Sequence, residues 1–175
     1  MGERENFEYA MEFVLKHEGG WAVDHAGPTN FGIVLRELER TGEDLTGDGA
    51  VDVQDLRGMT REEAKDWYRR YRWLPGRYGE IGDRGVAAKV FDCAVNMGPR
   101  EAHVILQRAL GATGYPVVVD GFLGPKTLGA VNVALPAALL AALRSEMAGV
   151  YRLIVARDRG RFGRFEKGWL ERAYR

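Results

Sequence analysis

Apolar residues recur every three or four positions along several stretches of the chain, a pattern typical of amphipathic helices. The first stretch ends at Gly19 and Gly20, because glycine accepts the left-handed conformation found at helix ends. Between residues 24 and 34, turn residues precede a short extended piece, which predicts a small β-hairpin. The apolar face of the first predicted helix consists of Phe7, Ala10, Met11, Val14 and Leu15.

Five more helices are predicted further along the chain. Thr60 and Glu63 form a capping box at the start of one, and Pro75-Gly76 ends it. Residues 86–97 and 99–110 predict a helical hairpin that turns at Gly98. A short helix is expected after the turn-rich segment 111–125, and a long helix over about 136–158. The fold class is therefore mainly α, with a possible lobe boundary in the loop over 76–83.

Composition narrows the function classes. Lys+Arg and Asp+Glu are equal at 25 each, so no long-range field draws the chain to nucleic acid, and no apolar run predicts stable membrane insertion. The amino terminus lacks the pattern of a secretory signal, so we expect synthesis in the cytoplasm. Cys93 is interpreted as a core residue, and Ser145, the only serine, lies inside an apolar helix, which argues against a serine or cysteine nucleophile.

Glu18 interrupts an apolar stripe. It follows Val14 by four residues, so a helical phase places it on the buried face in the last turn, where desolvation and the helix dipole both favour a protonated carboxyl. Asp24, in a polar turn, is expected to stay ionised, and Thr29 could orient a water molecule. A protonated and an ionised carboxyl together are the groups that hydrolyse a glycosidic bond. Periodicity alone leaves open that Glu18 turns to solvent and that Asp24 and Thr29 are turn residues.

The segment HEGGWAVDHAGPTNFGI at 17–33 resembles the start of glycoside hydrolase family 108, N-acetylmuramidases with a lysozyme-like fold. The resemblance implies that Glu18 is the catalytic acid, Asp24 the second carboxylate and Thr29 the active-site threonine. This chain departs from the family pattern at two places. The loop between Glu18 and Asp24 is shorter, and His25 stands where the family has a proline. Because the carboxylate separation decides between retention and inversion, the stereochemical outcome stays open.

Later segments resemble the peptidoglycan-binding region of the same family. They are FDCAVNMGPREAHVILQRALG and VDGFLGPKTLGAVN. We therefore expect a catalytic region over 1–82 and a helical peptidoglycan-binding region over 83–175 that completes the cleft. Aromatic faces and planar amides suit sugars, although core packing and turn capping remain alternatives for each residue. The substrate-binding candidates are Trp67, Tyr71, Trp73, Asn96, Gln107 and Asp120.

The segment DLTGDGAVDVQD at 44–55 has the spacing of an EF-hand-type calcium loop and resembles dockerin loops. Gly49 stands at the sixth position, where the backbone turns sharply. The alternative is a surface turn rich in aspartate and glycine. We expect a structural calcium ion away from the chemistry and no cofactor for catalysis. The candidate ligands are Asp44, Thr46, Asp48, the carbonyl of Ala50, Asp52 and Asp55.

These observations predict a lysozyme that cleaves the β-1,4 bond between N-acetylmuramic acid and N-acetylglucosamine of bacterial peptidoglycan. We expect a monomer that acts on the cell wall as a phage endolysin or a wall-remodelling factor, exported with the help of a holin. The main alternative is a peptidoglycan-binding module without turnover. A third alternative is a calcium-dependent interaction protein. Such a protein would need two aspartate loops, whereas this sequence contains a single one.

Overall fold

The computed structural model of the protein describes residues 2–17, 20–24 and 27–175, and the side chains of all of these except His17 and Asp24. The chain divides into two compact units, one of residues 11–75 and one that joins the first ten residues to 76–175. Helix α1 (Glu3–His17) contributes residues to both units. The predicted regions 1–82 and 83–175 divide the chain at a different place, and they remain a prediction.

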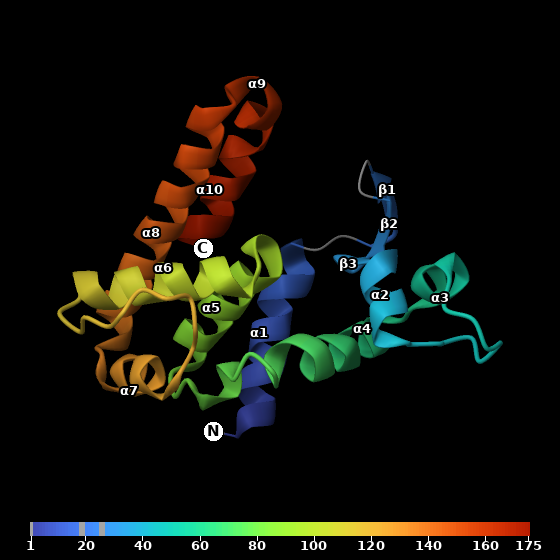
Figure 1. The fold of residues 1–175 in the computed structure, drawn as a ribbon, viewed down its shortest axis with the longest axis horizontal. Helices are drawn as coiled ribbons and strands as arrows, with labels where there is room; N and C mark the ends of the chain where they lie inside the picture. The colour runs from blue at the N-terminus through green and yellow to red at the C-terminus, as the bar shows by residue number, and fades with distance from the viewer. Residues whose placement is uncertain (1, 18–19, 25–26) are drawn as a thin grey trace. The chain divides into compact units, whose positions relative to one another are not determined.

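The unit of residues 11–75 contains a small antiparallel sheet and short helices (Figure 1). The strands lie in the order β1-β2-β3, so the chain forms two consecutive hairpins. Ile33, Leu38, Leu56, Trp67 and Trp73 are buried in its core. The elements are β1 (Ala22–Asp24), β2 (Gly27–Asn30), β3 (Ile33–Val34), α2 (Leu35–Thr41), α3 (Val53–Gly58), α4 (Arg61–Tyr68) and the π-helical turn η1 (Arg69–Trp73).

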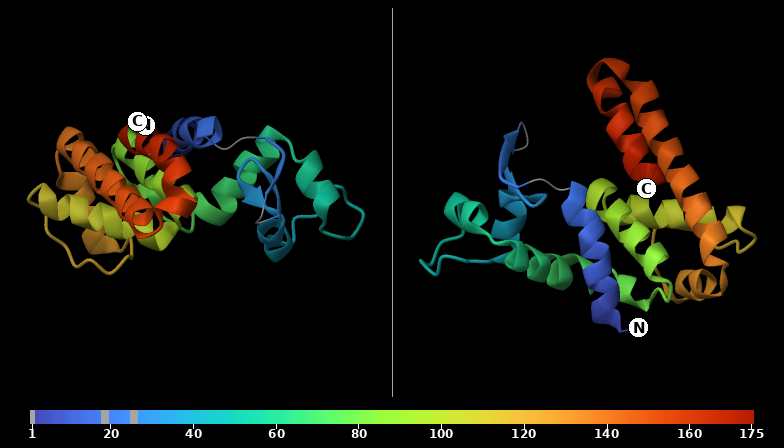
Figure 2. Two further views of the ribbon diagram at one scale, coloured as in Figure 1. Left: turned by 90° about the horizontal axis from the view of Figure 1, so that it is seen from above. Right: turned by 180° about the vertical axis from the view of Figure 1, so that it is seen from behind.

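The second unit is a helical bundle. Helices α5 and α6 form the predicted hairpin, which turns at Gly98 with a φ of 89° and restarts at Pro99. Helix α8 packs on both of them, and α10 packs on α8 (Figure 1, Figure 2). The elements are η2 (Tyr78–Glu80), α5 (Arg84–Met97), α6 (Pro99–Ala112), α7 (Pro125–Val133), α8 (Pro136–Arg157), α9 (Arg159–Phe162), η3 (Gly163–Phe165) and α10 (Glu166–Tyr174).

The carboxy-terminal helix is joined to this bundle by a buried ion pair. The guanidinium of Arg172 donates to the carboxylate of Asp92 at 2.8 Å, and both side chains are buried. The Lys89 ammonium donates to the carbonyl oxygen of Arg172 at 2.6 Å, and its burial lowers the pKa of Lys89. The ring of Trp169 stacks on that of Tyr151 with 5.2 Å between centroids. These contacts hold α10 against α5 and α8.

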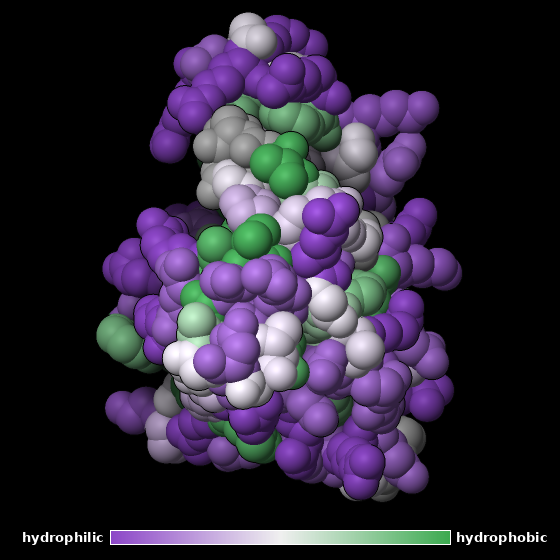
Figure 3. Space-filling view, turned by 90° about the vertical axis from the view of Figure 1, so that its right-hand side faces the viewer, coloured by the Kyte–Doolittle hydropathy of each residue, from purple (hydrophilic) through white to green (hydrophobic). Residues whose placement is uncertain are grey.

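The mainly α fold with a small sheet is confirmed. The capping box of Thr60 and Glu63 is present, and all five residues of the predicted apolar face of α1 are buried. Helices α2, α3, α9 and α10 were not predicted from the sequence. The face drawn in Figure 3 is mostly hydrophilic, with hydrophobic side chains in small separate areas.

No single helix of the described chain is long and apolar enough to cross a membrane. Helices α7 and α8 reach the length and apolar composition of a membrane span only when taken together, and the chain bends by 119° at the break between them.

Candidate functional site

Helix α1 leads directly to the predicted acid. Its buried apolar residues lie at 7, 10, 11, 14 and 15, and its last residue is His17. Glu18 is therefore the next residue in the chain after α1, but it lies outside the described residues. Its role, and the side-chain role of Asp24, stay predictions.

The backbone of the predicted hairpin places Asp24 and Thr29 in neighbouring strands. Asp24 ends β1 and pairs with Gly27, while Thr29 lies in β2, opposite Ala22 on one side and Val34 on the other. Thr29 is half-buried. The two candidate residues therefore lie two register positions apart in one hairpin.

The turn between β2 and β3 requires an unusual backbone. Phe31 and Gly32 have φ angles of 50° and 78°, as in the two-residue turns that match the twist of a hairpin. The hydroxyl of Tyr68 on α4 donates to the carbonyl oxygen of Phe31 at 3.0 Å. This bond stabilises a residue that is strained at positive φ because it carries a Cβ.

Asn30 fixes the hairpin to the following helix. Its buried amide donates to the carbonyl oxygens of Leu56 at 2.9 Å and Met59 at 3.4 Å, at the carboxyl end of α3. An unpaired buried amide is costly, so these bonds fix where β2 lies relative to α3. Sequence analysis did not identify Asn30, because its partners lie 26 and 29 residues further along the chain.

The aspartate-rich loop before α3 is folded around its own backbone. The buried carboxylate of Asp55 accepts bonds from the amide groups of Leu45, Thr46 and Asp52, each at 2.8 Å. The bond from the Asp52 amide is the largest cause of the lowered pKa of Asp55, and burial opposes it. Asp55 is thus the anionic centre of the loop.

The other loop aspartates also face backbone amide groups. Asp44 accepts from Gly47 at 2.6 Å and from Gly49 at 2.8 Å, and both glycines have positive φ. Asp48 accepts from Ala50 at 2.9 Å, and Asp52 caps α3 through Gln54. Among the described residues, no three His, Cys, Asp or Glu side chains are grouped so as to hold a metal ion. Calcium binding remains a prediction.

In the helical unit, Gln107 and Asp120 lie together. The amide nitrogen of Gln107 donates to Asp120 at 2.7 Å and to the carbonyl oxygen of Phe122 at 3.1 Å, while its oxygen accepts from the amides of Asp120 and Gly121. Gln107 is 1% exposed. It fixes the loop between α6 and α7, and so we assign it a positioning role.

Comparison with known proteins identifies the family. Residues 11–98 match the model described as glycosyl hydrolase 108, and residues 101–174 match the model described as a predicted peptidoglycan domain. The chain belongs to the glycosyl hydrolase 108 family. The solved structure of SagA from Brucella abortus is similar, at 30% sequence identity and a TM-score of 0.73, covering 97% of this chain and 90% of that one. No match was found among curated proteins.

These matches confirm the family resemblance and the peptidoglycan-binding region. The first match indicates a glycoside hydrolase, and the second indicates peptidoglycan as its substrate or partner. The hydrolase match begins within α1 and ends at the turn after α5, so it contains the positions of Glu18, Asp24 and Thr29.

Two of the predicted aromatic contacts of the glycosyl hydrolase 108 chain are corrected by the structure. Trp67 and Trp73 are 1% and 0% exposed, and the indole N–H of Trp67 donates to the hydroxyl of Thr41 at 3.0 Å. Both rings belong to the apolar face of α4 and η1 and fill the core, so neither presents a surface to a sugar. Periodicity placed them on one face but did not show that this face is covered.

Tyr71 is half-buried, and its hydroxyl group is already bonded. It donates to the carboxylate of Glu43, which also accepts from both terminal nitrogens of Arg70 at 2.8 and 3.0 Å. The bond to Glu43 and burial raise the pKa of Tyr71.

Trp21 is an aromatic residue with an exposed ring. Its side chain is 36% exposed, with the guanidinium of Arg57 over its ring at 5.4 Å. Trp21 lies within the HEGGW motif, but sequence analysis did not select it.

Asn96 is exposed on α5, where its side-chain oxygen accepts from the hydroxyl of Tyr151 at 2.7 Å.

Cys93, one turn before Asn96 on α5, is buried, and its desolvation raises its pKa to about 12. A thiol with so high a pKa stays protonated, which supports the prediction that Cys93 is a core residue rather than a nucleophile.

A buried histidine supports the loop that Gln107 fixes. The Nδ1 of His103 lies 3.1 Å from the carbonyl oxygen of Gly121, and its Nε2 lies 3.1 Å from the hydroxyl of Tyr78. A carbonyl oxygen can only accept, so Nδ1 carries the proton and Nε2 accepts from Tyr78 in the neutral ring. Burial lowers the pKa of His103, and the bond to Gly121 partly opposes this.

This geometry predicts a loss of stability in mild acid. The folded pKa of His103 lies below the ordinary value of about 6.5, so the unfolded chain binds a proton first as pH falls. The contribution of His103 should be constant above about pH 6.5 and decrease below it. Unfolding free energies measured across this range should depend less on pH in His103→Gln, whose amide can replace both hydrogen bonds. Equal pH dependence in the two proteins would contradict the assignment.

Proposed function

We propose that the chain is a lysozyme that cleaves the β-1,4 bond between N-acetylmuramic acid and N-acetylglucosamine in peptidoglycan. The observation that carries this proposal is the pair of adjacent matches, a glycosyl hydrolase 108 region followed by a peptidoglycan region, which together cover nearly the whole chain. The similarity to SagA over 97% of the chain supports the same arrangement.

Glu18 is the proton donor in this proposal. Its carboxyl group protonates the glycosidic oxygen while Asp24, as a carboxylate, orients a water molecule or stabilises the cationic sugar. Thr29, in the strand paired with that of Asp24, assists in holding the water. The sheet suits this task because Asn30 and Tyr68 fix the turn between β2 and β3, next to Thr29. Trp21, with its exposed ring, is the aromatic side chain best suited to contact a sugar face.

The decisive variant is Glu18→Gln, which keeps the shape of the side chain and removes its acidic proton. We expect the release of soluble fragments from dye-labelled peptidoglycan to fall by at least about a hundredfold, since general acid catalysis contributes 10² to 10⁴ in rate. Glu12→Gln is the matched control, because Glu12 is an exposed carboxylate on α1, six positions before Glu18 in the sequence. It should keep the full rate.

Two results would contradict the proposal. Glu18→Gln could retain full activity with an unchanged melting temperature, which would exclude Glu18 as the acid. Alternatively, the wild-type protein could bind purified peptidoglycan and release no fragments, which would favour the binding module without turnover.

We further propose that the loop over 44–55 binds a structural calcium ion. Its support is the spacing of five oxygen-bearing side chains together with the sharp turns at Gly47 and Gly49, whose φ angles are 75° and 90°. The carboxylates of Asp44, Asp48 and Asp52 would turn from backbone amides toward the ion. Bound calcium supplies positive charge that holds the loop together and takes no part in bond cleavage.

Calcium should therefore raise the melting temperature. Unfolding in millimolar calcium is compared with unfolding in a chelator, for wild type and for Asp48→Asn, whose side-chain oxygen can still accept the bond from Ala50. We expect a calcium-dependent increase of several degrees in the wild type and a much smaller one in the variant. Identical melting temperatures with calcium and with chelator would show that the loop is held by its backbone bonds alone.

A further inference from the structure

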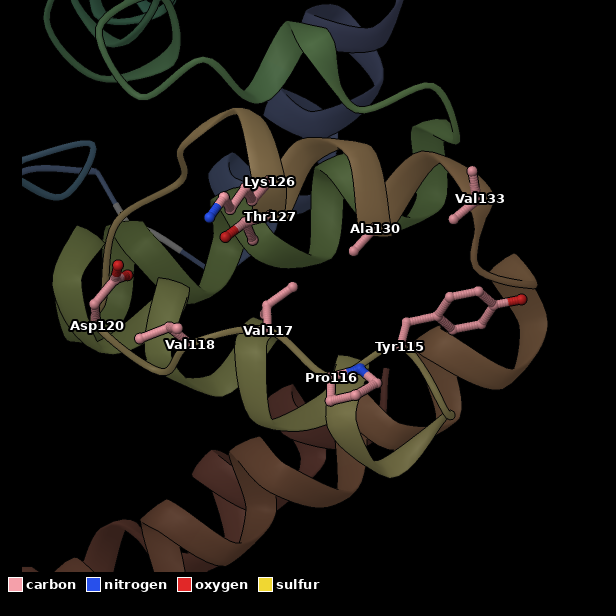
Figure 4. Close-up of a pocket in the computed structure, with 9 residues that line it drawn as sticks. All are labelled: Tyr115, Pro116, Val117, Val118, Asp120, Lys126, Thr127, Ala130 and Val133. Atoms are coloured by element: carbon pink, nitrogen blue, oxygen red, sulfur yellow. The ribbon is translucent and has the colours of Figure 1, made fainter.

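A groove in the helical unit has no role in the hydrolysis described above. It has a volume of about 790 Å³ and lies between the loop that follows α6 and one face of α7 (Figure 4). Lys126, Ala130 and Val133 line it from α7 at helical spacing, and Tyr115 and Val117 line it from the loop. It lies within residues 101–174, the part of the chain that matches the predicted peptidoglycan domain.

The two ends of the groove differ in chemistry. Asp120, Lys126 and Thr127 lie at one end, and Tyr115 and Val133 lie at the other, with Val117 and Ala130 between them (Figure 4). Two apolar side chains of the lining, Val118 and Val133, are 75% and 67% exposed. Exposed apolar residues that line a cavity are typical of a ligand site.

The charged end contains one group of each sign. The bond from Gln107, and then the bond from the amide of Phe122, lower the pKa of Asp120, so it is ionised at neutral pH. Lys126 is exposed, and within the described chain no hydrogen bond or ion pair engages its ammonium group. The groove therefore offers a carboxylate and an ammonium group beside a mainly apolar lining.

The loop that carries Asp120 is rigid, which favours binding of a defined ligand. Gln107 contacts residues 120, 121, 122 and 127 through both atoms of its amide, and His103 bonds the carbonyl oxygen of Gly121. Gly121 has a φ of 79°, and a Cβ there would lie 2.8 Å from a side-chain carbon of Arg100. The position of Asp120 is thus set before any ligand arrives, which reduces the entropic cost of binding.

Peptidoglycan offers two kinds of ligand, glycan strands and the short peptides attached to them. A glycan presents many hydroxyl groups and flat sugar faces, whereas this groove is lined mainly by valine, alanine and proline. A stem peptide presents alanine methyl groups, free carboxylates and, where it contains a diamino acid, an ammonium group. Its alternation of small apolar groups and opposite charges matches the groove.

We propose that this groove binds the stem peptide of peptidoglycan. Lys126 pairs with a free carboxylate of the peptide, Asp120 pairs with the ammonium group of its diamino acid, and Val117 and Ala130 contact the alanine methyl groups. The inference rests on the proposed function for its choice of polymer and adds that residues 101–174 recognise the peptide rather than the sugar.

The test uses the full chain and a synthetic stem tetrapeptide of alanine, D-glutamate, a diamino acid and D-alanine. Binding is measured by calorimetry, and amide resonances locate the site. We expect shifts confined to residues 115–121 and 126–133, and a dissociation constant about tenfold weaker in Lys126→Met. Lys167→Met, at an exposed lysine on α10, is the matched control and should bind as the wild type does.

A second variant tests the apolar part of the groove without changing charge. Ala130→Phe fills the apolar part of the groove and should abolish binding. Circular dichroism and the melting temperature confirm that the variant is folded. Three outcomes would overturn the proposal. They are no binding of the tetrapeptide to wild type, equal binding by Lys126→Met, and groove resonances that respond to a tetrasaccharide of N-acetylglucosamine but not to the peptide.

The outcome is independent of the hydrolysis experiment. The free tetrapeptide contains no glycosidic bond, so its binding does not require Glu18. A groove that binds the peptide while Glu18→Gln retains full activity would contradict the proposed acid and leave the peptide site intact.

Discussion

A polar group that is removed from water must find a partner inside the protein, and this constraint determines where the loops of the candidate site lie. Asn30 ties the β2–β3 hairpin to the end of α3, Asp55 draws together the loop over 44–55, and Gln107 holds the loop between α6 and α7 that carries Asp120. Each of these side chains is at most 5% exposed. In each case a single buried group orders a segment that would otherwise have few reasons to adopt one conformation.

The same constraint explains what the sequence could and could not predict. The apolar face of α1 and the hairpin of α5 and α6 were predictable because periodicity reports directly on burial. Trp67 and Trp73 were misinterpreted because a sequence shows which residues share a face but not whether another segment covers it. The bonds of Asn30 span 26 and 29 residues, and no local pattern predicts contacts at that separation.

The candidate site was predictable to a different degree in each unit. Gln107 and Asp120 were predicted as polar contacts to the substrate, and this role stays a prediction. The structure places them together, with the buried Gln107 positioning Asp120. Trp21 is exposed but was not predicted as a site residue. Its exposure depends on how the neighbouring segments pack, and the spacing of residues in the sequence does not show this. The two units thus divide the work in the proposed account, with residues 11–75 supplying the chemistry and the groove beside α7 supplying recognition of the peptide.

The central claim is that the chain breaks one particular bond of the glycan. The most direct measurement digests purified peptidoglycan with the protein, reduces the products with borohydride and identifies the newly formed reducing ends by mass spectrometry. The account predicts reduced N-acetylmuramic acid at the new ends. New ends that consist of reduced N-acetylglucosamine, or released peptides with intact glycan strands, would contradict it.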